Sequence, residues 1–386
     1  MKVILILADG MADEPLPELS NQTPLEYAKT PNMDRLAREG ACGMLRTVPE
    51  GCEPGSDIAN LSILGYDPAT YYTGRGPLEA ESMGVTLGPE DIAYRCNLVT
   101  IENGIMADFS AGHISSPEGA SLIASLEGRL PEGILMKAGI SYRNLLVVRK
   151  GAGAVTIPPH DIVGSPIYGY LPRDGDAGVL GRCMQDARRV FVSHPVNTER
   201  IRGGLPPATD IWPWSGGKRP QLPPFRERYG RTGGMISAVD LLNGIARCAG
   251  MEIIRVPGAT GYLDTDYEAK TRFALDALGH LDFVYVHVEA PDEAGHLGSI
   301  EEKVRAIERV DEMCGMVLDA FSGVIAVLPD HPTPVRIRTH TADPVPFVIH
   351  GGKKDNTRSF SEREAANGGY GLCYATGFLP LLFGLK

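Results

Sequence analysis

Three short apolar runs along the chain each stop close to an acidic residue. The runs, with the acid that follows each, are Val3–Ala8 with Asp9, Phe283–Val288 with Asp292, and Val324–Leu328 with Asp330. Apolar runs of this kind, rich in β-branched side chains, are typical of strands buried on both faces of a parallel sheet. Because ligands of open α/β sheets bind beyond the carboxyl ends of the strands, we expect the three acids to meet at one site.

Helical and strand patterns alternate regularly from about Met235 to the C-terminus. The predicted helices are 236–248, 267–278, 301–321 and 378–385, and the predicted strands are 253–256, 283–288, 324–328 and 345–349. Near the N-terminus, Thr30 and Pro31 favour the start of a helix and Gly40 favours its end. This alternation indicates an α/β core with a doubly wound, mainly parallel sheet.

The middle of the chain follows a different pattern. Strands are predicted at 93–101 and 145–148 and helices at 118–126 and 182–192, with turn-rich segments between them. The stretch 203–224 holds six of the 30 prolines and both tryptophans, so we interpret it as a hinge or linker. We therefore expect a core domain formed by residues 1–81 and 222–386. A smaller inserted α+β domain, residues 82–221 with hinge segments, would interrupt it.

The net charge of the chain argues against two classes of binding partner. The 386 residues carry a net charge of −11, with both signs spread along the sequence, which argues against nucleic acid and anionic membranes as partners. No stretch approaches the ~20 apolar residues of a transmembrane helix. The seven cysteines are scattered without paired spacing, as in reduced cytoplasmic proteins. We expect a cytoplasmic monomer or small homo-oligomer that acts on a small molecule.

Histidines accompany the acids at spacings that suit metal binding. His296 follows Asp292 by four residues, so a short helix would project both side chains from one face. His331 directly follows Asp330, and His340 lies shortly after. Taken singly, such pairs are more often surface pairs or turns, but their joint occurrence at strand ends favours a metal centre.

Six such ligands could hold two metal ions ~3.5–4 Å apart, the spacing that clamps a phosphoryl group. A mixed carboxylate and imidazole set favours Mn²⁺ or Zn²⁺ over Mg²⁺, with Co²⁺ as a further alternative.

Ser56 is the candidate nucleophile. A helix is predicted to begin at Ser56 or Asp57, where the helix dipole and free N–H groups favour an anion. Simple N-capping is the alternative interpretation, because serine is a preferred capping residue. Beside a two-metal site, coordination would lower the pKa of the hydroxyl and prepare its oxygen for attack on phosphorus.

Several motifs resemble the archaeal-type cofactor-independent phosphoglycerate mutases of the alkaline phosphatase superfamily. The matching stretches include DGMAD at 9–13, PGSDIANLSILGYDP at 54–68, YYTGRGPLEA at 71–80, PGATG at 257–261, DEAGHLG at 292–298 and DPVP at 343–346. They span nearly the whole chain. The resemblance implies an alkaline-phosphatase-like core interrupted by an inserted domain.

The resemblance also implies the roles of individual residues. One metal would be held by Asp292, His296 and His340, and the second by Asp9, Ser56, Asp330 and His331. Ser56 would take the phosphoryl group of 3-phosphoglycerate and return it to the 2-hydroxyl, without 2,3-bisphosphoglycerate. Basic residues would grip this small phosphorylated metabolite, and the candidates are Arg95, His113 and Arg143 in the insert and Arg75 on the core side.

Departures from the family pattern keep other functions open. The segment Pro329–Pro334 reads PDHPTP where the archaeal mutases typically have Gly-Asp-His-Ser-Thr-Pro. Residues 289–294 and 211–214 also resemble a bacterial subgroup proposed to be homoserine kinases. The sequence contains no Walker A or kinase-type glycine loop, which favours the mutase. A metal-dependent phosphatase and a non-catalytic phosphate- or sugar-binding relative are the further alternatives.

Overall fold

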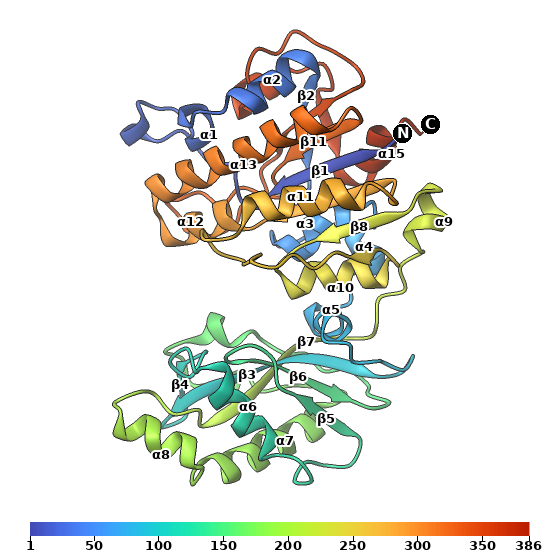
Figure 1. Ribbon diagram of the computed structural model, residues 1–386. Helices are drawn as coiled ribbons and strands as arrows, with labels where there is room; N and C mark the ends of the chain where they lie inside the picture. The colour runs from blue at the N-terminus through green and yellow to red at the C-terminus, as the bar shows by residue number, and fades with distance from the viewer. Residues whose placement is uncertain (386) are drawn as a thin grey trace. The chain divides into compact units, whose positions relative to one another are not determined.

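A computed structural model describes residues 1–385, which divide into two compact units (Figure 1). The first unit contains residues 1–72 and the C-terminal segment that begins at Leu222, and the second contains Thr73–Gln221. Each unit has its own sheet and its own hydrophobic core.

The first unit is built on an eight-stranded sheet of order β13-β2-β12-β11-β1-β10-β8-β9. The strands are β1 (Val3–Ala8), β2 (Ala41–Arg46), β8 (Gly233–Ile236), β9 (Glu252–Ile253), β10 (Phe283–Val288), β11 (Val324–Leu328), β12 (Val345–His350) and β13 (Leu372–Tyr374). In this sheet β12 runs antiparallel to both of its neighbours, and the remaining pairings are parallel. The mainly parallel α/β core expected from the sequence is confirmed.

Helices cover both faces of this sheet. They are α1 (Pro24–Tyr27), α2 (Pro31–Glu39), α3 (Ser56–Ile63), α4 (Pro68–Tyr71), α9 (Phe225–Tyr229), α10 (Asp240–Cys248), α11 (Tyr267–Ala277), α12 (Ala290–Leu297), α13 (Ile300–Ala320), α14 (Glu362–Ala365) and α15 (Phe378–Phe383). Figure 1 shows α11 and α13 crossing the face of β1. Side chains of α2, α11 and α13 pack there with alternate residues of the central strands, such as Ile4 and Val284.

The opposite face carries the other residues of each strand. Phe283 of β10 stacks on Phe225 of α9 with ring centroids 5.5 Å apart, and it meets Phe383 of α15 edge-on. Burial on both faces explains the uninterrupted apolar sequences of β1, β10 and β11. The helix predicted from residue 236 begins at Asp240, because 233–236 forms β8 beside β10.

The second unit contains a smaller antiparallel sheet. Its strands are β3 (Ile92–Glu102), β4 (Ile105–Asp108), β5 (Ile134–Lys137), β6 (Arg143–Val148) and β7 (Asp210–Gly217), and its helices are α5 (Arg75–Ser82), α6 (Ser116–Ala124), α7 (Ala177–Phe191) and α8 (Pro195–Arg202). The sheet order is β4-β3-β6-β5, and β7 also pairs with β3. This arrangement is the α+β architecture expected of the inserted segment.

Two expectations about the insert are wrong in detail. The stretch 203–224 is not simply a linker, because β7 pairs with β3 and buries Trp212 and Trp214 in the core of the second unit. The first boundary lies after residue 72 rather than 81. The reason is that α5 packs on the insert's own sheet, where Ala80 joins Ala93 and Val147 in one apolar cluster.

Two further findings concern the described residues. None of their helices is long and apolar enough to cross a membrane. All seven cysteines are free thiols, and five of them are buried.

Candidate active site

The carboxyl ends of β1, β10 and β11 bring the predicted acids together. Asp9 follows β1 and Asp330 follows β11, and the parallel register places these ends side by side in the sheet. Asp292 lies in α12, which begins two residues after β10. All three carboxylates are at most 5% exposed, although each would be fully hydrated in an unfolded chain. Burying three acids at one sheet edge requires compensating positive charge.

Asp292, His296 and His340 form the first group of candidate ligands. The i, i+4 spacing on α12 sets His296 Nε2 3.2 Å from Asp292 Oδ2, as the sequence predicted. His340 comes from the loop before β12, and its Nε2 lies 3.0 Å from His296 Nε2 and 3.5 Å from Asp292 Oδ1. Three ligand atoms from two segments of the chain therefore converge.

Asp9, Ser56, Asp330 and His331 form the second group. The Ser56 hydroxyl lies 3.1 Å from His331 Nε2 and 3.4 Å from Asp9 Oδ2. His331 Nε2 in turn lies 3.5 Å from Asp9 Oδ1 and 3.6 Å from Asp330 Oδ2. Ser56 is the first residue of α3, and Gly55 takes the capping position. The N-capping interpretation of Ser56 is therefore wrong, and its hydroxyl points to the acids instead.

The electrostatics of the second group fit a cation. Burial, with the neighbouring charges of Asp330, Asp292 and Glu289, raises the pKa of Asp9 well above its usual range. Asp9 Oδ1 is buried without a hydrogen-bond partner among the described residues, and an unsatisfied buried carboxylate oxygen is costly. A divalent ion would satisfy this oxygen and relieve the repulsion, so these residues fit a metal centre.

The first group balances its charge with imidazoles. Burial acts to raise the pKa of Asp292, but hydrogen bonds from His296 and His340 outweigh it and bring the pKa well below its usual range. The hydrogen bond to Asp292 correspondingly raises the pKa of His296 to about 9. A metal that binds here must displace a proton, so its affinity must fall as the pH falls.

His287 joins the second group, although the sequence pattern did not identify it. Its Nε2 lies 2.9 Å from Asp9 Oδ2, and Asp9, His287 and Asp330 each offer a ligand atom within 4.8 Å of the others. Burial lowers the pKa of His287 to about 3, so the imidazole is neutral. The available signal was a histidine inside the otherwise hydrophobic run FVYVHV.

Asn60 is a second residue that the pattern did not identify. Its amide donates to Asp330 Oδ2 at 2.8 Å and to the carbonyl of Ser56, also at 2.8 Å. The hydroxyl of Tyr285 donates to the Asn60 amide oxygen from β10. The start of α3, and Ser56 with it, is thereby tied to the sheet.

The second unit gathers the candidate basic residues around aromatic rings. Arg95 Cζ lies 4.6 Å from the centroid of the Trp214 ring, and its Nε is 3.0 Å from Glu79 Oε1. Arg143 Cζ lies 5.1 Å from the centroid of the Tyr142 ring. Arg75 was expected on the core side, but it opens α5 in the second unit, where its backbone N–H donates to Ser215 Oγ at 3.0 Å. Burial, opposed by Glu79 and reinforced by the charges of Arg75 and Arg143, lowers the pKa of Arg95.

Two histidines complete this cluster. His113 is exposed, has a positive φ of 49°, and lies 6.1 Å from Tyr142 between ring centroids. His160, which the sequence did not single out, lies 5.3 Å from Trp214. Burial lowers the pKa of His160, and the charges of Arg75 and Arg95 lower it further. Three arginines and two histidines in one region suit a small anion.

Comparison with known proteins places the chain in a family. A family model described as 2,3-bisphosphoglycerate-independent phosphoglycerate mutase matches residues 37–197. A protein of that name from Methanothrix thermoacetophila is 51% identical over 390 residues, covering 99% of both chains. A second from Methanothermobacter thermautotrophicus is 53% identical over 381 residues, covering 96% of this chain and 94% of the relative.

The chain belongs to this phosphoglycerate mutase family.

Solved structures extend the agreement to the fold. A protein from Pyrococcus horikoshii is 33% identical, covers 99% of this chain and 97% of its own, and superposes with a TM-score of 0.87. The cofactor-independent phosphoglycerate mutase from Thermoplasma acidophilum is 30% identical, covers 100% and 99%, and has a TM-score of 0.70. This member of the mutase family therefore shares its fold over the full length.

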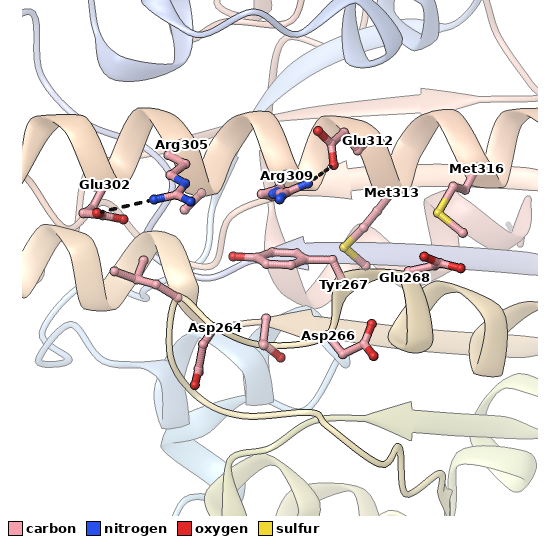
Figure 2. Close-up of a pocket in the computed structure, with 13 residues that line it drawn as sticks. Asp264, Asp266, Tyr267, Glu268, Glu302, Arg305, Arg309, Glu312, Met313 and Met316 are labelled. Atoms are coloured by element: carbon pink, nitrogen blue, oxygen red, sulfur yellow. Dashed lines mark hydrogen bonds and ion pairs between the residues drawn. The ribbon is translucent and has the colours of Figure 1, made fainter.

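A large cavity of this mutase family member lies away from the candidate ligands. It measures 630 Å³ and lies between α13 and the segment 263–268 (Figure 2). Its arginines are paired on the same helix, since Arg309 Nη1 is 2.6 Å from Glu312 and Arg305 Nη1 is 3.9 Å from Glu302. None of the candidate metal ligands lines this cavity, and neither does Ser56. The size of the cavity is therefore not evidence that the reaction takes place there.

Proposed function

We propose that this chain interconverts 3-phosphoglycerate and 2-phosphoglycerate at a two-metal site, without 2,3-bisphosphoglycerate. The observation that carries the proposal is the position of Ser56, whose hydroxyl lies within 3.4 Å of both Asp9 and His331 at the start of α3. The names of full-length relatives at about 50% identity support the same reaction.

The two groups of converging side chains would each hold one divalent ion. Asp292, His296 and His340 would bind the first, and Asp9, Ser56, Asp330 and His331 the second, with His287 beside Asp9. Mn²⁺ suits this mixture of carboxylate and imidazole best. When bound, the ions supply positive charge that stabilises the phosphoryl group in transfer and lowers the pKa of the Ser56 hydroxyl.

Ser56 would be the nucleophile in the first half of the reaction and the leaving group in the second half. Its oxygen gives up its proton and forms a bond to phosphorus, while the bond between phosphorus and the 3-oxygen of glycerate breaks and the released 3-oxygen takes up a proton. The 2-hydroxyl of the reoriented glycerate then attacks the phosphoserine, gives up its proton, and regenerates Ser56. The phosphoryl group that leaves the 3-oxygen returns to the 2-oxygen of the same glycerate, so the overall reaction is an isomerisation.

The basic cluster of the second unit would bind the anionic groups of the substrate. Arg95, His113 and Arg143 lie along the aromatic residues Tyr142 and Trp214, and the charge of Arg75 acts on Arg95. Carboxylate and phosphate are the groups that arginine forks recognise best. The seven scattered free thiols support a cytoplasmic location.

The first test follows the conversion of 3-phosphoglycerate by ³¹P NMR with Mn²⁺, without ATP or 2,3-bisphosphoglycerate. We expect 2-phosphoglycerate to form, and Ser56→Ala to abolish its formation because no phosphoserine can be made. Ser62→Ala is the matched control on the same helix, since Ser62 donates only to the carbonyl of Ile58, and it should retain activity. ATP with homoserine should give no product, and homoserine phosphorylation without 2-phosphoglycerate would overturn the proposal.

A further inference from the structure

Lys303 is a fully buried lysine close to the candidate metal ligands, although it belongs to neither group. It lies on α13 and is 0% exposed. Its ammonium lies 2.7 Å from Asp13 Oδ2, 2.8 Å from the carbonyl of Thr333 and 3.2 Å from that of Ala12. All three ammonium donors are satisfied. Replacing a buried ion pair by apolar residues is often neutral or stabilising, so stability alone does not explain a buried lysine here.

The partners of Lys303 belong to the two loops that carry metal ligands. Ala12 and Asp13 follow Asp9, and Thr333 follows Asp330 and His331. The loops also bond to each other, since the N–H of Thr333 donates to Ala12 O at 3.3 Å and that of Val335 donates to Asp13 Oδ2 at 3.1 Å. Lys303 therefore holds the loop after β1 and the loop after β11 against α13 through hydrogen bonds.

Thr333 links Lys303 to the candidate metal ligands Asp292 and His331. Its hydroxyl donates to Asp292 Oδ1, and the same oxygen lies 3.3 Å from His331 Nδ1. A hydroxyl has one proton, so donation to Asp292 leaves the oxygen as the acceptor for a proton on His331 Nδ1. His331 Nε2, which faces Ser56 and Asp9, is then the unprotonated nitrogen that can bind a metal.

Two glycines, Gly10 and Gly295, lie close against Thr333. A Cβ added to Gly10 would lie 2.5 Å from Thr333 Oγ1, and one added to Gly295 would lie 2.4 Å from the Thr333 carbonyl oxygen. Both glycines therefore let the backbone close around Thr333. The Thr333 backbone is held by Lys303 at its carbonyl, and its hydroxyl is directed to Asp292.

We propose that Lys303 and Thr333 are positioning residues of the metal centre: Lys303 holds Thr333 in place, and the Thr333 hydroxyl orients Asp292 and fixes the proton of His331 on Nδ1. The inference rests on the proposed function, because it takes Asp292 and His331 as metal ligands. It assigns one hydroxyl a role in both ligand groups.

The test measures Mn²⁺ binding to the metal-free full chain by calorimetry. Thr333→Val keeps the shape of the side chain and removes the hydroxyl, and it should weaken Mn²⁺ binding ~10–100-fold, the usual cost of losing a partner of a ligand. Thr333→Ser keeps the hydroxyl and should therefore bind Mn²⁺ nearly as tightly as wild type does. Thr341→Val is the matched control, because the Thr341 hydroxyl has no hydrogen-bond partner among the described residues, and it should bind as wild type does.

Lys303 is tested together with its counter-ion. Lys303→Met alone leaves Asp13 buried and unpaired and risks unfolding, so the double variant Lys303→Met, Asp13→Asn is used. Its melting temperature without metal shows whether it folds. We expect a folded protein whose affinity for Mn²⁺ falls by a factor similar to that of Thr333→Val.

Unchanged Mn²⁺ affinity in Thr333→Val would overturn the inference, whatever its melting temperature. Equal losses in Thr333→Val and Thr333→Ser would overturn it too, because the effect would then come from packing rather than from the hydroxyl. Failure of the proposed function looks different, since the wild type would then bind Mn²⁺ but form no 2-phosphoglycerate.

Discussion

One half-buried carboxyl, that of Glu362, should make the stability of this protein depend on pH. Glu362 at the start of α14 accepts hydrogen bonds from Thr23 Oγ1 at 2.7 Å and from the N–H of Asp13 at 3.2 Å. Burial nevertheless dominates and raises its pKa to about 7. A carboxyl that would be ionised at neutral pH in an unfolded chain is therefore partly protonated in the fold.

We predict that Glu362→Gln reduces the loss of stability between pH 5 and pH 8. The folded pKa is raised, so Glu362 contributes stability that is fully present below the unfolded pKa, near 4.5, and lost as the pH rises through about 7. The contribution is ~1–3 kcal/mol, because one pKa unit corresponds to about 1.4 kcal/mol. Urea unfolding of the metal-free protein at both pH values measures it. Glu364→Gln on the same helix is the control, and an identical pH dependence in wild type and Glu362→Gln would contradict the prediction.

Among the elements, β7 changes the picture most. Its sequence, DIWPWSGG, contains a proline and two glycines, which are unfavourable in a strand. It nevertheless forms a strand beside β3 and buries both tryptophans. Trp212 donates to the carbonyl of Ile157 at 2.8 Å, and Trp214 donates to Asn97 Oδ1 at 3.0 Å. Each indole therefore combines a large apolar area with a satisfied polar group, and the strand is part of the insert's core.

We predict that Trp212→Ala destabilises the second unit by ~3–5 kcal/mol, the usual cost of truncating a buried aromatic side chain. Urea unfolding followed by far-UV circular dichroism measures the change. Tyr168→Ala is the control, because Tyr168 is 76% exposed, and it should shift the unfolding midpoint little. If the segment behaved as a flexible linker, both variants would unfold like the wild type.

The sequence predicted the bounds of strands best where both faces of the strand are buried. The bounds of β1, β10 and β11 agree with their apolar runs residue for residue. By contrast, β7 contains Pro213 and two glycines, and it is a strand only because distant β3 pairs with it. His287 was missed for a related reason. Its contact with Asp9 depends on the register that sets it opposite Leu7, and the sequence does not reveal register.

At the scale of the whole molecule, the candidate ligands are confined to one of two units. Asp9, Ser56, Asp292, His296, Asp330, His331 and His340 all belong to the first unit. The basic cluster around Arg95 belongs to the second. Metal binding and binding of the substrate's anionic groups would therefore be separable in experiments.

We predict that Mn²⁺ alone protects only the first unit from hydrogen exchange. At ~100 times its dissociation constant, an ion that binds the folded state adds about 2.7 kcal/mol of stability. Exchange measured by mass spectrometry should slow in peptides from 1–72 and 222–385 and stay unchanged in peptides from 73–221. A chelator should reverse the effect, and equal protection of both units would contradict the prediction.

The position of β1 in its sheet has a consequence for synthesis on the ribosome. Val3 pairs with Phe283 and with Val324, about 280 and 320 residues later. At roughly 5–20 residues per second, β1 waits about 15 to 55 seconds for its first partner. During that time VILILA is an exposed apolar segment of high β-propensity, the kind that aggregates. Lys2 and Asp9 flank it, so the aspartate proposed as a metal ligand also places a charge beside the nascent strand, where it opposes aggregation.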